Sequence, residues 1–216
     1  MVERYHPGAY HERSNLLIRM IERRRTSWIV RLLEVGGDES VIEVGVGAGN
    51  VLERVPAARR FGLDLSMRLL GDARRRLGRR AGFIQGDAAA LPIASRSIDR
   101  VICSEVLEHL PDPSAAVAEI ARVVRQHGIV VLSVPNEPLI DRIKMVLRWA
   151  RVLPLFSSKG YGVPADMKDE WHLHEFDRTR LTEIVKPNLA IERIVGVPSD
   201  FFPVRWVARC RPAAAH

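Results

Sequence analysis

Residues Val41–Asn50 read Val-Ile-Glu-Val-Gly-Val-Gly-Ala-Gly-Asn, an apolar run that leads into three closely spaced glycines. A glycine inside a helix or strand costs backbone entropy, so this spacing is typical of a sharp turn. A turn without side chains also lets the backbone lie directly against a ligand. The stretch therefore predicts a strand, a tight turn, and a binding site at that turn.

Strand and helix patterns alternate on both sides of this turn. This alternation predicts an α/β fold, with a Rossmann-like, seven-stranded and mostly parallel sheet that carries helices on both faces. Ligands of such sheets bind at the carboxyl ends of the strands, near the point where the strand order reverses. The expected strands are 40–45, 60–65, 82–85, 97–104 and 128–134, and the expected helices are 14–34, 50–55, 66–77 and 113–125.

The alternation ends after Pro135. The remaining pattern predicts a helix over 139–156, a loop over 157–170, a helix over 177–185 with Asp177 or Thr179 as its N-cap, and an antiparallel hairpin from 189–197 and 203–209. We expect one domain in four parts: a lid and helix (1–37), a cofactor-binding core (38–136), a helical cap (137–176), and a C-terminal helix and hairpin (177–216).

The composition is that of an ordinary globular protein of 216 residues, with a formal net charge of +7. Clustered arginines indicate either an anionic partner or solvated helix faces. Cys103 and Cys210 have no metal-binding spacing. The charged opening residues lack the apolar core of a secretory signal, and no uncharged apolar run reaches the ~18 residues of a membrane span. We therefore expect a cytoplasmic protein.

The glycine turn differs from the common phosphate-binding turns. Asn50 stands where the dinucleotide fingerprint has its last glycine, and no Lys-Ser/Thr pair follows as in a P-loop. Glu43, just before the turn, would repel a pyrophosphate and would suit a ligand that carries a cation.

The pattern Glu43-x-Gly45-x-Gly47-x-Gly49 resembles motif I of the class I S-adenosylmethionine-dependent methyltransferases. The resemblance implies that S-adenosylmethionine is the cofactor and S-adenosylhomocysteine the product. It also implies that the glycine loop lies against the amino-acid end of the cofactor, where Glu43 contacts the ammonium group, often through water.

Further segments resemble later motifs of the same family, in the same order. Asp64, with Leu65, follows the second strand 19 residues after Gly45, where the family has an acid for the two ribose hydroxyls. Asp87 and Ala88 match the adenine-binding loop, and Ser104 and Glu105 match the segment near the methionine moiety. Asp64 could instead cap the next helix, and Asp87 could be a turn residue.

Ser104–Leu107 reads Ser-Glu-Val-Leu, in place of the Asn/Asp-Pro-Pro-Tyr/Phe of amino-group methyltransferases that act on nucleic acids. It resembles the small-molecule branch, which includes the ubiquinone-biosynthesis O-methyltransferases. The resemblance implies methylation of a small molecule, foremost at a hydroxyl, and argues against a nucleic-acid partner. N- or C-methylation, an RNA methyltransferase and a non-catalytic cofactor-binding protein are the alternatives, and the oligomeric state stays open.

Candidate bases are His174 and His172, in the stretch Trp171–Phe176, and His109. A histidine titrates near neutral pH and suits the removal of a hydroxyl proton. We prefer His174 over His172, and we expect no metal, although His172, His174 and Glu175 could hold one. The alternative is that these histidines only fasten their loops.

Segment 139–156 is basic and amphipathic and contains Trp149. Such a helix either lies on an anionic membrane or packs over the active site as a cap. Tyr5–Tyr10 is a candidate lid over the cofactor.

Overall fold

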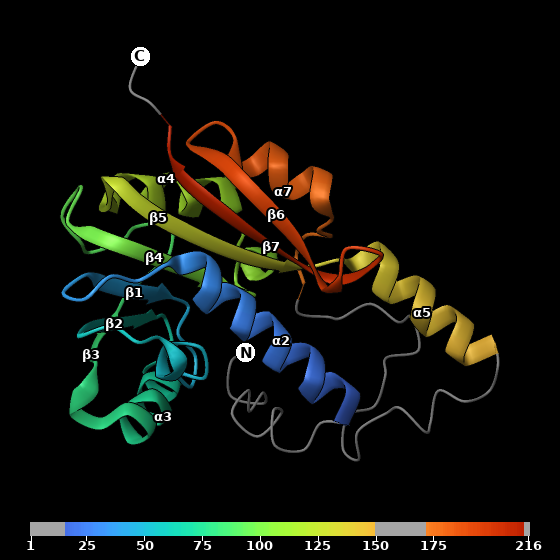
Figure 1. Ribbon diagram of the computed structural model, residues 1–216, viewed down its shortest axis with the longest axis horizontal. Helices are drawn as coiled ribbons and strands as arrows, with labels where there is room; N and C mark the ends of the chain where they lie inside the picture. The colour runs from blue at the N-terminus through green and yellow to red at the C-terminus, as the bar shows by residue number, and fades with distance from the viewer. Residues whose placement is uncertain (1–15, 150–171, 214–216) are drawn as a thin grey trace.

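The computed structural model describes residues 16–149 and 172–213 and shows one seven-stranded sheet (Figure 1). The strands lie in the order β3-β2-β1-β4-β5-β7-β6, and the first five are parallel, whereas β7 runs antiparallel to both of its neighbours. This confirms the predicted mostly parallel sheet and its C-terminal hairpin. The strands are β1 Ser40–Val44, β2 Arg59–Asp64, β3 Gly82–Gln85, β4 Ile98–Ser104, β5 Val124–Pro135, β6 Leu189–Ser199 and β7 Phe202–Pro212.

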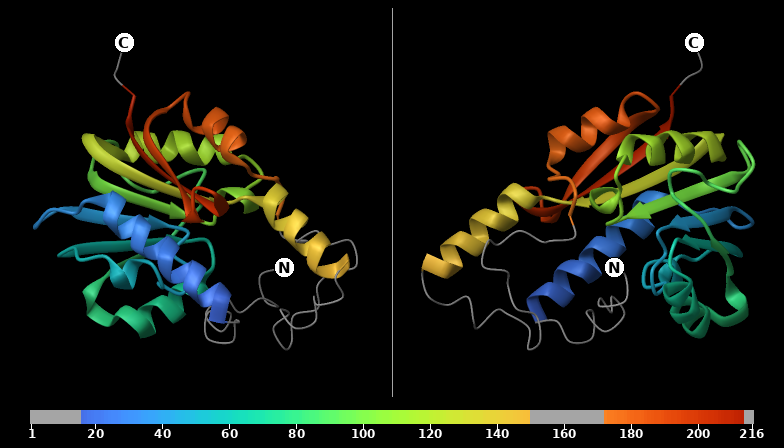
Figure 2. Two further views of the ribbon diagram at one scale, coloured as in Figure 1. Left: turned by 45° about the vertical axis from the view of Figure 1, so that its right-hand side comes forward. Right: turned by 180° about the vertical axis from the view of Figure 1, so that it is seen from behind.

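Helices cover both faces of the sheet (Figures 1 and 2). On one face lie α2 (Leu16–Leu33) and α3 (Met67–Leu77), and on the other lie α4 (Pro113–Val123) and α7 (Arg178–Val185). The central strands β1 and β4 are buried on both faces over 40–44 and 101–104, a stretch in which only Ser40, Glu43 and Ser104 are polar.

Polar side chains begin the helices where the sequence indicates. Asp112 accepts hydrogen bonds from the N–H groups of Ser114 and Ala115, at 2.9 and 3.1 Å. Asp177 accepts one from Arg180 N–H at 2.7 Å, which confirms it as the N-cap of α7.

Two expectations about local structure were wrong. The segment 50–55 forms only a three-residue 3₁₀ turn, η2 (Leu52–Arg54), and α4 ends at Val123 because Val124 pairs with Ile98 across the sheet. The helix expected over 139–156 begins earlier, as α5 (Glu137–Trp149), and its predicted continuation lies outside the described residues. The 3₁₀ turns η3 (Gly78–Arg80) and η4 (Leu107–His109) are the other helical elements of the described residues.

The strand order reverses at β1, which has β2 on one side and β4 on the other. The loops that follow β1 and β4 therefore meet at one edge of the sheet, where α/β folds bind ligands. The first residues of α2 and the whole of α5 extend beyond this same edge (Figure 2). None of the helices in the described part of the chain has the length and apolarity to span a bilayer.

Candidate cofactor and acceptor site

The turn after β1 is tied to β2 by two backbone hydrogen bonds. Gly45 N–H and Val46 N–H both donate to Leu63 O, at 2.7 and 2.9 Å. Gly45, Gly47 and Gly49 have φ angles of 72°, 53° and 80°, in the left-handed region that favours glycine.

The three glycines meet different surroundings. A Cβ at Gly45 would lie 2.3 Å from Val106 Cγ2, and a Cβ at Gly49 would lie 2.5 Å from Leu77 Cδ1. A Cβ at Gly47 would meet no described atom within 4 Å. Gly45 and Gly49 are therefore required by packing within the protein, whereas Gly47 borders the open space where a ligand would lie.

Asp64, at the end of β2, fastens the glycine turn. Its Oδ2 accepts a hydrogen bond from Gly47 N–H at 2.8 Å, and its Oδ1 accepts one from Ser66 N–H at 2.9 Å. An ionised carboxylate has about four acceptor positions, so capacity remains for two ribose hydroxyls. Leu65 beside it is 68% exposed.

Glu43 lies buried beneath the turn. Its Oε2 accepts a hydrogen bond from Leu52 N–H at 2.9 Å, which holds the segment that follows the glycines. Burial raises the pKa of Glu43 to about 8, against the opposing effects of the Leu52 amide and the Arg25 guanidinium. A ligand ammonium nearby would favour the ionised form of this carboxyl.

Asp87 and Ala88 form a tight turn after β3. Asp87 Oδ1 accepts a hydrogen bond from Ala89 N–H at 2.9 Å, and Asp87 O accepts one from Ala90 N–H at 3.2 Å. Asp87 is exposed and Ala88 is buried. The turn itself thus uses one carboxylate oxygen of the residue expected to contact adenine.

A buried network joins the loop after β4 to α2, β5 and β7. Arg25, from α2, donates to Ser104 Oγ, and also to Ser133 Oγ at 3.3 Å. Glu105, with φ 55°, accepts a hydrogen bond from Ser133 Oγ at 2.9 Å and forms an ion pair with Arg205 at 2.7 Å. Burial alone would lower the pKa of Arg25, but Glu22, Glu105 and Glu43 outweigh it, so the pKa is raised and the guanidinium stays charged.

Sequence reasoning missed Arg25 and Arg205. Arg25 stands in a run of three arginines, which suggested a solvated helix face. A signal was present, since Ile21, Arg25 and Ile29 are spaced by one helical turn and share the inward face of α2. Arg205 has no comparable local signal.

Glu108, His109 and His172 come together beside this network. One potential ligand atom of each lies within 4.8 Å of those of the other two, and the two imidazole centroids are 4.8 Å apart in an edge-on arrangement. Glu108 is 1% exposed, and its Oε2 has no hydrogen-bond partner among the described residues. Burial, and then the charge of Glu105, raise the pKa of Glu108. In the described part of the chain, this is the group whose donors could hold a divalent cation.

Glu137 holds His172 in this cluster. Glu137 Oε1 contacts His172 Nδ1, and its Oε2 accepts a hydrogen bond from Phe176 N–H. The backbone carbonyl of Glu108 accepts a hydrogen bond from Leu173 N–H at 2.8 Å. The preferred base, His174, instead places its Nε2 3.2 Å from Pro111 O. His172 therefore lies in the cluster with Glu108 and His109, whereas His174 lies outside that group.

Comparison with known proteins adds to this geometry. Residues 42–132 match the family model of a methyltransferase domain. The ubiquinone biosynthesis O-methyltransferase of Aromatoleum aromaticum is 36% identical over 118 residues, which are 52% of this chain and 50% of that protein. The chain thus spans about half the length of such curated relatives.

Solved structures share the fold. A protein from Pyrococcus horikoshii superposes with a TM-score of 0.69 at 16% identity, over 97% of this chain and all of that one. The N-methyltransferase NodS from Bradyrhizobium japonicum, solved with S-adenosylhomocysteine, gives a TM-score of 0.64 at 19% identity, over 89% of this chain and 87% of that one.

The sheet order, the glycine turn and Asp64 fit the S-adenosylmethionine site expected from the sequence. Gly47 leaves the turn open toward the ligand space, and Asp64 presents a carboxylate at the end of the next strand. Residues 42–132, which contain these features, therefore form a methyltransferase domain similar to those of the class I S-adenosylmethionine-dependent methyltransferases.

Proposed function

We propose that the protein transfers a methyl group from S-adenosylmethionine to a hydroxyl group of a small molecule. The observation that carries this proposal is the cluster of His172, His109 and Glu108 at the edge of the sheet that also holds the glycine turn. A base at this edge would serve an acceptor that must lose a proton, as a hydroxyl does. The name of the Aromatoleum relative, an O-methyltransferase, supports the same acceptor atom.

In this proposal, some residues of the chain bind the cofactor and others remove the proton of the acceptor. Bound S-adenosylmethionine supplies a methyl group on a positively charged sulfur. Asp64 and the open face of the glycine turn at Gly47 hold the cofactor, while His172 Nε2 takes the acceptor's hydroxyl proton. Glu137, in contact with Nδ1 of His172, holds the ring and stabilises the imidazolium that forms.

Substituting His172 with glutamine tests the proposed base. We expect kcat for a phenolic or catecholic acceptor to fall about 100-fold or more, because general-base catalysis contributes roughly 10²–10⁴-fold. S-adenosylhomocysteine release would be followed over a panel of such acceptors and of amines. The matched control is His127→Gln, since His127 is exposed on β5 outside the cluster.

Repeating this assay in the presence of EDTA distinguishes a role of His172 as a base from a role as a metal ligand. Full activity in EDTA, with loss in His172→Gln, identifies His172 as the base. Loss in EDTA that Mg²⁺ or Zn²⁺ restores would identify Glu108, His109 and His172 as cation ligands and correct the expectation of no metal. Methylation of amines alone, or no turnover with any acceptor despite tight S-adenosylhomocysteine binding, would favour the N-methyltransferase or the non-catalytic alternative.

We further propose that α5 brings the site to a membrane surface that holds a lipophilic acceptor. Met145, Val146 and Trp149 are 60%, 62% and 88% exposed on α5, and Arg142 supplies positive charge on the same helix, whereas Lys144 pairs with Asp141 at 3.3 Å. This combination suits an anionic bilayer surface. The remainder of the expected amphipathic segment, 150–156, and the candidate lid at Tyr5–Tyr10 lie outside the described residues.

Vesicle flotation tests the role of α5. With vesicles rich in anionic lipid at low salt, we expect the wild type to float, and Trp149→Ala to remain largely in solution. Because Trp149 is exposed, its removal leaves the core intact. Arg79→Gln is a control for net charge, since Arg79 lies in the exposed turn η3 after α3. Equal flotation of wild type and Trp149→Ala would assign α5 a capping role only.

A further inference from the structure

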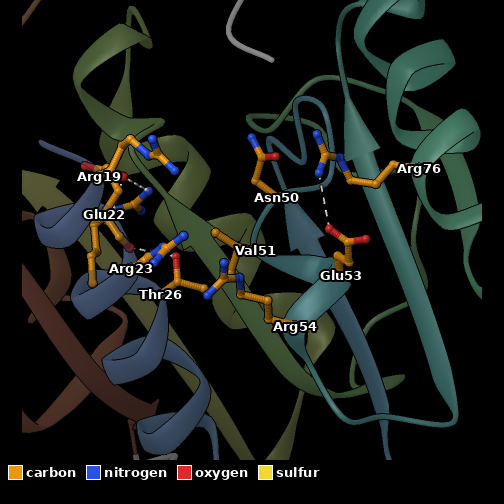
Figure 3. A pocket seen from close by; sticks show the side chains of 10 residues that line it. Arg19, Glu22, Arg23, Thr26, Asn50, Val51, Glu53, Arg54 and Arg76 are labelled. Atoms are coloured by element: carbon orange, nitrogen blue, oxygen red, sulfur yellow. Dashed lines mark hydrogen bonds and ion pairs between the residues drawn. The ribbon is translucent and has the colours of Figure 1, made fainter. Parts of the chain in front are cut away.

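The crossover from β1 to β2 leaves an open pocket on one face of the sheet. Parallel strands are usually joined through a full α-helix, but here the crossover contains only the three-residue turn η2. The pocket has a volume of about 200 Å³ and lies between α2, η2 and the end of α3 (Figure 3). Its lining consists of Arg19, Glu22, Arg23, Arg25, Thr26, Asn50, Val51, Glu53, Arg54 and Arg76.

Five arginines and two glutamates give this lining a net charge of +3. Both carboxylates already have cationic partners. Glu22 pairs with Arg25 at 2.6 Å, and Glu53 pairs with Arg76 at 3.2 Å. Arg76 is held further by its hydrogen bond to Ala48 O, at 3.0 Å. The carboxylates therefore do not neutralise the other arginines of the pocket.

Three guanidinium groups remain without an ion pair to any described residue: Arg19, Arg23 and Arg54. Arg19 and Arg23 are one turn apart on α2, so their like charges destabilise the helix. Arg54 reaches into the same hollow from the opposite wall (Figure 3). An anion between these side chains would relieve their repulsion and accept hydrogen bonds from three directions.

We propose that this pocket binds a phosphate group of a small phosphorylated molecule. The planar donor fork of arginine matches phosphate oxygens in pairs, and a phosphate carries the charge to engage three such forks. Asp64 and Asp87 do not line the pocket, so it is separate from the side chains expected to hold the cofactor's ribose and adenine. Asn50 and Val51 do line it, and they directly follow the glycine turn, which is expected to lie against the cofactor's amino-acid end. The proposal does not depend on which acceptor the enzyme methylates.

Calorimetric titration with inorganic pyrophosphate tests this site. We expect the wild type to bind pyrophosphate, and Arg23→Gln and Arg54→Gln to bind it at least about tenfold more weakly, since each variant loses charge-assisted hydrogen bonds. Arg24→Gln is the matched control: it removes the same charge from the next residue of α2, which is exposed and does not line the pocket. We expect Arg24→Gln to bind like the wild type, and all four proteins to bind S-adenosylhomocysteine equally.

Three results would overturn the proposal. Equal weakening by Arg24→Gln and Arg23→Gln would show only diffuse positive charge, and a failure of the wild type to bind pyrophosphate would show that the pocket is not an anion site. Displacement of pyrophosphate by S-adenosylhomocysteine would assign the arginines to the cofactor. A failure to bind S-adenosylhomocysteine at all would instead contradict the proposed function. Pyrophosphate inhibition that is competitive with the acceptor would place the phosphate on the acceptor, and noncompetitive inhibition would place it on a separate ligand.

Discussion

Substituting Gly45 with alanine is expected to destabilise the protein by about 3 kcal/mol or more, the range of severe core substitutions. The new methyl group would lie 2.3 Å from Val106 Cγ2, at a residue whose φ of 72° already disfavours a side chain. For a domain of this size, the loss corresponds to a fall of roughly 6–12 °C in Tm. Thermal unfolding followed by circular dichroism measures it.

Two further variants serve as controls for the Gly45→Ala experiment. Adding Val106→Ala to Gly45→Ala removes both γ-carbons, the nearer one at 2.3 Å, and leaves Val106 Cβ 3.3 Å from the new methyl, so part of the lost stability should return. Gly47→Ala meets no described atom within 4 Å and should lose only about 1–2 kcal/mol for its left-handed backbone. It should, however, weaken S-adenosylhomocysteine binding, because its methyl group enters the ligand space. Equal unfolding of the two variants would contradict these separate roles.

These contrasts show what the glycine pattern could and could not predict. Three glycines in five residues predict a turn, because the backbone cost is local. The pattern does not distinguish the glycine that faces a ligand from those that face Val106 or Leu77, because those partners come from elsewhere in the chain. The distinction required the tertiary structure.

The strands of the core were predictable for a similar reason. β1 and β3 have nearly the expected bounds, since apolar runs between turn residues are local signals. The start of β5 was not predictable, because residues after Pro113 continue a helical pattern while Val124 is drawn into the sheet by its pairing with Ile98. Tertiary pairing outweighs helix propensity there.

In the candidate site, too, some residues could be predicted from local sequence and others depend on tertiary contacts. Asp64 follows a strand at a recognisable distance from the glycines, and the structure places it against Gly47. The contact of His172 with Glu137, and the ion pair of Glu105 with Arg205, join residues far apart in the sequence. A motif therefore predicts the cofactor half of the site better than the acceptor half, which is assembled from segments without a common spacing.

Substituting Asp64 with alanine is expected to raise the Kd for S-adenosylhomocysteine about 100-fold, which corresponds to roughly 2.8 kcal/mol. The variant removes the proposed acceptor of two ribose hydroxyls, and hydrogen bonds to a charged group are worth roughly 1.5–3 kcal/mol. It also frees the N–H groups of Gly47 and Ser66, which Asp64 now engages at 2.8 and 2.9 Å, so the turn loses its support. Calorimetric titration on the folded variant measures the change.

Two variants separate ligand binding from support of the turn. Asp72→Ala removes an acid from α3 that pairs with Arg75, and it should bind S-adenosylhomocysteine like the wild type. Asp64→Asn keeps one oxygen for a backbone N–H but loses the charge and the second acceptor, so its affinity should fall between those of the wild type and Asp64→Ala. If Asp64→Ala folds and binds S-adenosylhomocysteine as tightly as Asp72→Ala, then Asp64 only fastens Gly47 and Ser66. The ribose contact would then have to come from another residue at the end of β2.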